Sequence, residues 1–183
     1  MKYLPNIYGE MVWLRPITFS DTDRIVEWRN NPEVRKHFIF RDHFTYEMHE
    51  EWMRSKVLQE EVIQYIIHRR IDNKPIGSSY FRNIDKKNGS AEFGIFIGEN
   101  DSRGHGYGRD STKCFIDFGF KELKLHRIML RLLEDNKRAL NSYLAAGFVE
   151  EGVFKDMVYL DGEYKNVVFM AAINPINEGD QGR

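Results

Sequence analysis

Apolar and polar positions repeat along this chain with two different periods, one typical of strands and one typical of helices. Segments of the two kinds alternate. Seven segments have the short apolar blocks or the two-residue alternation of β-strands, namely residues 10–15, 64–70, 75–82, 90–97, 127–133, 148–159 and 164–172. Four segments repeat apolar residues at helical spacing: one starts near a capping-box-like pair, Ser20 and Asp23, and the others cover 45–58, 107–120 and 136–146. Strands interleaved with helices in this order predict an α/β fold.

Turn residues stand at the ends of these segments. Asp72-Asn73 and Asp161-Gly162 favour tight turns, so the last two strands are expected to form a hairpin. Gly147 stands where the end of a helix favours glycine. Neither repeats nor a linker-like stretch divides the chain. We therefore predict one domain over residues 1–173, followed by a flexible polar tail, 174–183.

The composition argues against several classes of function. The chain has 183 residues, of which 42% are hydrophobic and 30% charged, as in ordinary globular domains. Its formal net charge of −1 predicts no nucleic-acid partner. No apolar stretch has the length of a membrane span, and residues 1–10 lack a signal-peptide core, so we predict a cytoplasmic protein without a membrane partner. Cys114 is the single cysteine and the six histidines lack metal-site spacing, so no metal is predicted.

A glycine-rich stretch between a predicted strand and a predicted helix carries the strongest chemical signal. Gly104, Gly106 and Gly108 alternate with other residues, and glycine lets several backbone N–H groups approach a ligand. The helix that follows adds its unpaired N–H groups and the positive end of its dipole, which favour a phosphate or pyrophosphate. A P-loop is excluded because no Lys-Ser or Lys-Thr follows the glycines, and a dinucleotide fold is disfavoured because Arg109 replaces its third glycine. A loop that merely caps the helix is the alternative interpretation.

Three segments together resemble the GNAT N-acetyltransferase superfamily, and the resemblance covers nearly the whole chain. They are residues 91–97 (AEFGIFI) followed by 103–108 (RGHGYG), residues 136–148 (NKRALNSYLAAGF), and residues 150–153 (EEGV) with 161–164 (DGEY). The last is similar to the ribosomal-protein and polyamine branches. The resemblance implies a mixed, mostly antiparallel sheet of six to seven strands with about four helices, splayed at strand 91–97 where acetyl-CoA is held. It also implies a homodimer.

The resemblance further implies which residues hold acetyl-CoA. The backbone of the loop would bind the pyrophosphate through Arg103, Gly104, His105, Gly106, Tyr107, Gly108 and Arg109. The pantetheine amides would pair with the backbone of Ile95, Phe96 and Ile97, as an added strand does. Asn136 would cap its helix and reach the cofactor, and Asn141 is a further contact. For the His105 side chain we favour a solvent-facing position without a specific role.

Tyr143 and Glu92 are the predicted catalytic residues. The family's tyrosine at this place donates a proton to the departing CoA thiolate; without the resemblance, Tyr143 reads as an ordinary core aromatic. Glu92 is a candidate general base acting on the amine through water, and a salt bridge is the competing interpretation. His126 and Glu134 are weaker candidates for proton transfer. Cys114 lies among apolar helix positions, so we expect a buried, inert thiol and direct transfer in a ternary complex.

The acceptor amine is predicted from residues 28–53, together with the last hairpin. Basic and aromatic residues gather here, and the predicted acceptor-binding residues are Trp28, Arg29, Asn30, Phe38 and Arg41. Such a segment would repel a polycation and suits a phosphate or a sugar ring. Residues 28–34 (WRNNPEV) also resemble acetyltransferases that act on nucleotide-linked amino sugars. We therefore predict a small primary amine. A polyamine, a ribosomal-protein N-terminus and a catalytically silent acyl-CoA sensor remain alternatives.

Overall fold

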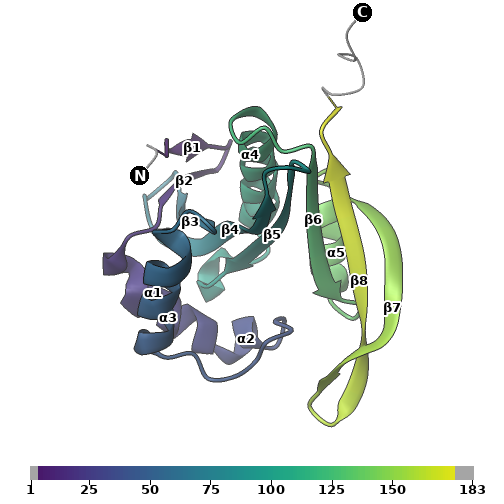
Figure 1. Ribbon diagram of the computed structural model, residues 1–183. Coiled ribbons are helices and arrows are strands. Elements are labelled where there is room, and N and C mark those ends of the chain that lie inside the picture. The colour runs from purple at the N-terminus through teal and green to yellow at the C-terminus, as the bar shows by residue number, and fades with distance from the viewer. Residues whose placement is uncertain (1–3, 176–183) are drawn as a thin grey trace, which may run out of the picture.

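The computed structural model describes residues 4–175, and within them a single sheet of eight strands runs through the molecule (Figure 1). The strands lie in the order β1-β2-β3-β4-β5-β6-β8-β7. Their bounds are β1 Ile7–Tyr8, β2 Val12–Pro16, β3 Ile63–Arg69, β4 Pro75–Asp85, β5 Ser90–Ile97, β6 Arg127–Leu133, β7 Val149–Leu160 and β8 Glu163–Ile173. All neighbouring strands are antiparallel except β5 and β6. The predicted mixed, mostly antiparallel sheet is confirmed.

Helices cover both faces of the sheet (Figure 1). The α-helices are α1 Thr22–Asn30, α2 Pro32–Arg35, α3 Tyr46–Trp52, α4 Tyr107–Lys121 and α5 Lys137–Leu144, with short 3₁₀ turns at Phe19–Asp21 and Asn100–Ser102 and a π-helical turn at Met53–Val57. On one face, Phe115 of α4 stacks on Phe81 of β4 with ring centroids 4.4 Å apart. On the other face, Trp28 of α1 packs edge-on against Phe96 of β5 at 6.2 Å.

The sheet opens in its middle, between β5 and β6. These two strands pair only over the first three residues of β5, and the last pair joins Glu92 to Met129. Beyond it β5 stays paired with β4, while β6 continues along β8. The edge of β5 from Phe93 to Ile97 therefore faces a gap instead of a strand. The predicted splay is confirmed: the chain returns through α4, and β6 pairs only with the start of β5.

The eighth strand, β1, was not predicted, because two residues carry too little pattern to be recognised. The four-residue helix α2 was missed for the same reason. The acid that precedes the first helix is Asp21 instead of Asp23: its carboxylate accepts the Thr18 N–H at 2.9 Å and pairs with Arg15 at 2.6 Å.

The predicted flexible tail begins too early. Asn174 is buried, its backbone N–H donates to His126 O at 2.8 Å, and its side chain donates to Leu125 O at 3.1 Å. The rest of the predicted tail, residues 176–183, lies outside the described residues.

Candidate active site

A cavity of about 890 Å³ lies at the opening of the sheet. Most of the residues predicted from the sequence lie on its wall: Arg29, Phe38, Glu92, Ile95, Phe96, Ile97, Arg103, Gly104, His105, Gly106, Gly108, Arg109, Asn136, Asn141 and Tyr143. Trp28, Asn30, Arg41 and Tyr107 are not among the wall residues. The cavity thus joins segments that are up to 116 positions apart in the chain, from Arg29 to Ala145.

The glycine loop presents backbone donors to the cavity. Gly104 and Gly106 have φ of +91° and +88°, a region that glycine adopts without a steric cost. The first hydrogen bond of α4 is Asp110 N–H to Gly106 O at 3.0 Å, so the four preceding amides, from Gly106 to Arg109, have no partner inside the helix. Free amides and a helix dipole in this arrangement can hold an anion, and the phosphate-binding role of the loop stays a prediction.

Acidic side chains at a helix N-terminus compete with an external anion, but here the only one in the first turn is occupied elsewhere. The Asp110 carboxylate accepts the backbone N–H groups of Glu10, Met11 and Val12 at 3.1, 2.7 and 3.0 Å. Arg138 of α5 approaches from the opposite side, and its guanidinium lies 3.4 Å from the position of a Cβ at Gly104. Sequence reasoning did not select Arg138 as a site residue, although it belongs to the segment 136–148.

The two arginines predicted in the loop have different positions. Arg103 folds back onto the end of β5, donating from Nε to Ile97 O at 3.1 Å and from a terminal nitrogen to Gly98 O at 3.0 Å. Arg103 therefore holds the loop against the strand. Arg109 and His105 are exposed. The interpretation of His105 as a solvent-facing side chain agrees with this position.

The open edge of β5 offers alternate residues to a ligand. Gly98 N–H donates to Ile76 O on the β4 side, whereas Ile97 O accepts from Arg103 on the other side. Backbone groups alternate along a strand, so those of Ile95 and Ile97 face the gap and those of Phe96 face β4. This alternation disfavours pairing of the Phe96 backbone with a ligand, and that contact stays a prediction. Phe96 contributes its side chain, which is 7% exposed and packs against Trp28 and Phe38.

Tyr143 lies on the face of α5 that points into the molecule. Its ring packs edge-on against Phe93 at 6.3 Å and Phe148 at 5.8 Å, and the residue lines the cavity. Burial, with a smaller contribution from Tyr80, raises the pKa of the phenol above its usual value. The hydroxyl consequently keeps its proton at physiological pH and is available as a donor. Asn136 caps α5, as predicted: its side chain accepts the Ala139 N–H at 3.2 Å.

Glu92 is surrounded by cations. Its carboxylate contacts Arg82 of β4 at 2.7 Å and Arg131 of β6 at 3.2 Å, and it accepts a hydrogen bond from Asn83 at 2.9 Å. Burial by itself would raise the pKa of Glu92, but the two arginines outweigh it and hold the pKa below the ordinary value. A carboxylate stabilised in this way is a weak base. The geometry favours the salt-bridge interpretation, and the general-base role of Glu92 stays a prediction.

Three of the predicted acceptor residues serve the local structure. Trp28 donates from its indole to Glu99 at 2.8 Å, and the Asn30 side chain bonds to the backbone N–H and carbonyl of Phe44 at 2.9 and 2.7 Å. Arg41 pairs with Asp161 at the turn of the β7–β8 hairpin. These contacts explain why the three residues are absent from the cavity wall.

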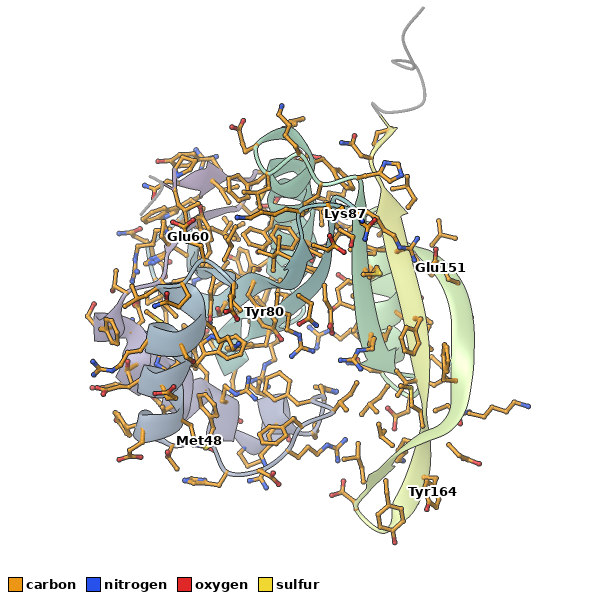
Figure 2. The ribbon with its side chains drawn as sticks, viewed as in Figure 1. Met48, Glu60, Tyr80, Lys87, Glu151 and Tyr164 are labelled. Carbon is orange, nitrogen blue, oxygen red and sulfur yellow. The ribbon has the colours of Figure 1, made fainter. Side chains whose placement is uncertain are left out.

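Arg29 differs from its neighbours in having aromatic partners only. Its guanidinium carbon lies 4.7 Å from the ring centre of Phe38 and 4.5 Å from that of Phe44. Tyr80 of β4, which sequence reasoning missed, lies opposite Gly94 in the register and at the centre of the molecule in Figure 2. A Cβ at Gly94 would lie 2.2 Å from the Tyr80 ring, so this glycine makes room for the tyrosine.

Cys114 and Glu134 lie outside the cavity wall. Burial raises the pKa of the Cys114 thiol to about 12, and the nearby Asp110 adds to the effect, so the thiol does not ionise at neutral pH. Glu134 accepts a hydrogen bond from Asn166 at 2.8 Å. Within residues 4–175 no group of three or more His, Cys, Asp or Glu side chains is arranged to bind a metal. In the same residues, every helix is too short or too polar to cross a membrane.

Comparison with known proteins gives a consistent result. The sequence model described as "Acetyltransferase (GNAT) domain" matches residues 12–149. The N-acetyltransferase p20 of Bacillus licheniformis, described as uncharacterized, is 25% identical over 173 residues, which are 93% of this chain and 97% of the relative. A spermidine N(1)-acetyltransferase of Vibrio cholerae is 26% identical over 154 residues, which are 84% of this chain and 88% of the relative.

Solved structures show the same fold. A crystal structure of the spermidine N-acetyltransferase from Vibrio cholerae in complex with CoA and spermine has a TM-score of 0.84 at 24% identity, over 91% of this chain and 97% of the other. A dodecameric structure of the Vibrio cholerae enzyme has a TM-score of 0.78 at 23% identity, over 95% of this chain and 100% of the other.

Proposed function

The chain belongs to the GNAT family of acetyl-CoA-dependent N-acetyltransferases, and from this premise we propose that it transfers acetyl directly to the primary amine of a small molecule. The observation that carries the proposal is the cavity at the splayed strands, where the free amides of α4, the open edge of β5 and the Tyr143 phenol line one space. Direct transfer is supported by Cys114, whose protonated thiol lies outside that space.

The residues at the opening fit acetyl-CoA. The four amides from Gly106 to Arg109, with Arg138 beside Gly104, suit a pyrophosphate, and the groups of Ile95 and Ile97 that face the gap suit the amides of pantetheine. Bound acetyl-CoA supplies an acetyl group activated as a thioester. Asn136, with its side chain committed to capping α5, and Asn141 on the cavity wall complete the predicted contacts.

Tyr143 is the proposed proton donor to the departing sulfur. Its buried phenol stays protonated, and protonation of the thiolate prevents the reverse reaction. The amine must lose a proton before it attacks. Glu92, tied to Arg82 and Arg131, is a poor acceptor for that proton. We therefore assign Glu92 to the positioning of the two arginines and propose that the proton leaves through water.

The acceptor has two supported candidates. Relatives named as spermidine acetyltransferases in two species support a polyamine. The arginines on the acceptor side of the cavity support an amine that carries a negative group, such as an amino-sugar nucleotide. The N-terminal amine of a protein is a third candidate, supported by a relative named as a putative ribosomal N-acetyltransferase that is 26% identical over 110 residues.

An acceptor screen tests the proposal. Purified protein is incubated with acetyl-CoA and amino-sugar nucleotides, spermidine, an aminoglycoside or an N-terminal peptide, and free CoA is measured together with the acetylated product. We expect turnover on at least one amine. Acetyl-CoA binding without CoA release on any of them would instead establish the silent sensor.

We also propose that the protein is a homodimer that uses the edge strand β7. Val149, Phe154, Met157 and Tyr159 on this strand are 65, 53, 42 and 63% exposed. Tyr164 of β8, near the end of the hairpin, packs against Tyr159 with ring centroids 5.0 Å apart (Figure 2). Sedimentation of the wild type and of Phe154→Ser tests the interface. A monomeric wild type would contradict it.

A further inference from the structure

We propose that the acceptor amine carries a carboxylate or phosphate group, and that Arg29 of α1 binds this oxyanion at the wall of the cavity. The inference rests on the proposed function and narrows its substrate class. It depends on Arg29 and on the charged groups around it, which we call the arginine cluster: Arg29, Arg82 and Arg131 with Tyr80 and Glu92.

Arg29 is the member of the cluster without an anionic partner. No hydrogen bond or ion pair joins its side chain to another group within residues 4–175, and its buried Nε atom lacks an acceptor. The rings of Phe38 and Phe44 hold the guanidinium plane without neutralising its charge. An arginine held against two aromatic rings on the wall of a cavity, without an acceptor for its side chain, matches the planar geometry of a carboxylate or phosphate.

The free protein bears a cost for this arrangement. Burial lowers the pKa of Arg29, the nearby Arg82 lowers it further, and the Tyr80 phenol only partly offsets these effects. A buried charge without a partner is unfavourable for folding. A purely structural residue at this position would be more favourable as an uncharged side chain of similar length. The unpaired charge of Arg29 is explained if an anionic ligand pairs with it.

The rest of the arginine cluster strengthens the positive potential. Arg82 and Arg131 share a single carboxylate, that of Glu92, so the three arginines and one glutamate leave a formal charge of +2. The cluster and Tyr143, the proposed proton donor, line the same cavity. An anionic group held at Arg29 would place an amine of the same small molecule toward Tyr143.

The same charges disfavour a polycation. Spermidine carries additional ammonium groups that would enter a region of formal charge +2 in a partly dehydrated cavity. The Glu92 carboxylate already pairs with two arginines and is not free to attract these ammonium groups. A relative's preference for spermidine therefore does not transfer to this chain if Arg29 has the proposed role.

Matched pairs of primary amines test the inference. O-phosphoethanolamine is compared with ethanolamine, and β-alanine with propylamine, and spermidine is added as the polycation. For the wild type, Arg29→Gln, Arg29→Met and Arg24→Gln, kcat/KM is measured by CoA release. Binding of each amine to the CoA-saturated protein is measured by calorimetry. Arg24 is the matched control, because it lies on the same helix, outside the cavity, and 3.6 Å from Asp21.

We expect the wild type to prefer the anionic member of at least one pair, and the phosphate and carboxylate pairs identify which group is preferred. Arg29→Gln should weaken that member roughly 10- to 100-fold, the equivalent of one charge-assisted hydrogen bond, and leave the neutral member unchanged. Arg24→Gln should behave as the wild type. Arg29→Met, which keeps the aliphatic stem, should melt at the same temperature as the wild type or higher.

Several results would overturn the inference: equal treatment of both members of each pair, a preference for spermidine, or an equal loss for both members in Arg29→Gln. Failure of the proposed function is distinguishable. Selective binding of anionic amines without CoA release would refute acetyl transfer and uphold the role of Arg29. Turnover without anionic preference would uphold acetyl transfer and refute the role of Arg29.

Discussion

The two ends of the cavity are built from different kinds of chemical group, backbone groups at one end and side chains at the other. The cofactor end consists mainly of backbone groups, namely the amides at the start of α4 and the open edge of β5. The acceptor end consists of side chains, with Arg29 from α1, Arg82 from β4 and Arg131 from β6. Backbone donors depend on the conformation of the chain, whereas side chains can change independently of it. If the proposed sites are correct, acetyl-CoA binding depends on backbone conformation and acceptor binding on the choice of side chains.

The two faces of the sheet differ in the polarity of the groups buried on them. The core under α4 is aromatic and aliphatic, with Phe81, Phe93 and Phe115 at its centre. The layer of α1 and α3 contains buried polar groups, including Asp21 and His49. The first face provides a rigid support for the splay. The second is more sensitive to charge and pH.

The sharpest test at the cofactor end is Tyr143→Phe. Removal of the hydroxyl takes away the proposed proton donor but keeps the ring that packs on Phe93 and Phe148. We expect kcat to fall by about 10²–10⁴ with little change in the Kd of acetyl-CoA. Tyr46→Phe, at an exposed position of α3, is the control. Equal kcat values for Tyr143→Phe and wild type would remove the tyrosine from the mechanism.

Acid should destabilise the layer of α1 and α3 first, through His49. This ring is buried, contacts Thr22 at 3.0 Å, and has its pKa lowered by burial to about 4, against 6.5 for an exposed histidine. The unfolded chain then binds a proton that the folded chain does not, so stability is lost as the pH falls below about 6.5. At pH 5 the loss is about 2 kcal/mol.

Urea unfolding at pH 7 and pH 5 measures this effect. The difference between the two values should shrink in His49→Gln and persist in His43→Gln, which changes an exposed histidine. An unchanged difference in His49→Gln would locate the acid sensitivity elsewhere.

A substitution that strains the backbone of the glycine loop should affect only binding at the cofactor end. Gly106→Val places a β-branched residue at φ +88°, which costs on the order of 1–2 kcal/mol or distorts the loop. We expect the Kd of acetyl-CoA to rise roughly tenfold. Gly162→Val imposes the same strain, at φ +88°, in the β7–β8 turn and serves as the control. If both variants bind acetyl-CoA equally well, the loop is only a helix cap.

The smallest expected effect belongs to Glu92→Gln. Because the pKa of Glu92 is held below its ordinary value, the carboxylate is already ionised from about pH 6 upward. We expect a loss of a few fold in kcat/KM without a change in the shape of its pH profile. Loss of activity concentrated at the acidic end of the profile would restore Glu92 as the general base.

Much of the fold was predictable because its signals are local. Strand β5 and strand β6 were located with small errors or none, and α5 was bounded by its Asn136 cap and by Gly147. The exceptions are short elements such as β1, where tertiary pairing with β2 decides the structure. Asn174 was misplaced in the tail because its partners, Leu125 and His126, lie far away in the sequence.

The sequence by itself determined the cofactor end, because glycine spacing and helix starts act on the backbone within a few residues. Only the tertiary structure decided the acceptor end. It removed Trp28, Asn30 and Arg41 from the wall, turned the Phe96 backbone toward β4, and surrounded Glu92 with Arg82 and Arg131. Such a cluster depends on strand register and on the splay, which bring together residues from β4, β5 and β6, and no local pattern encodes which charges will meet across that distance.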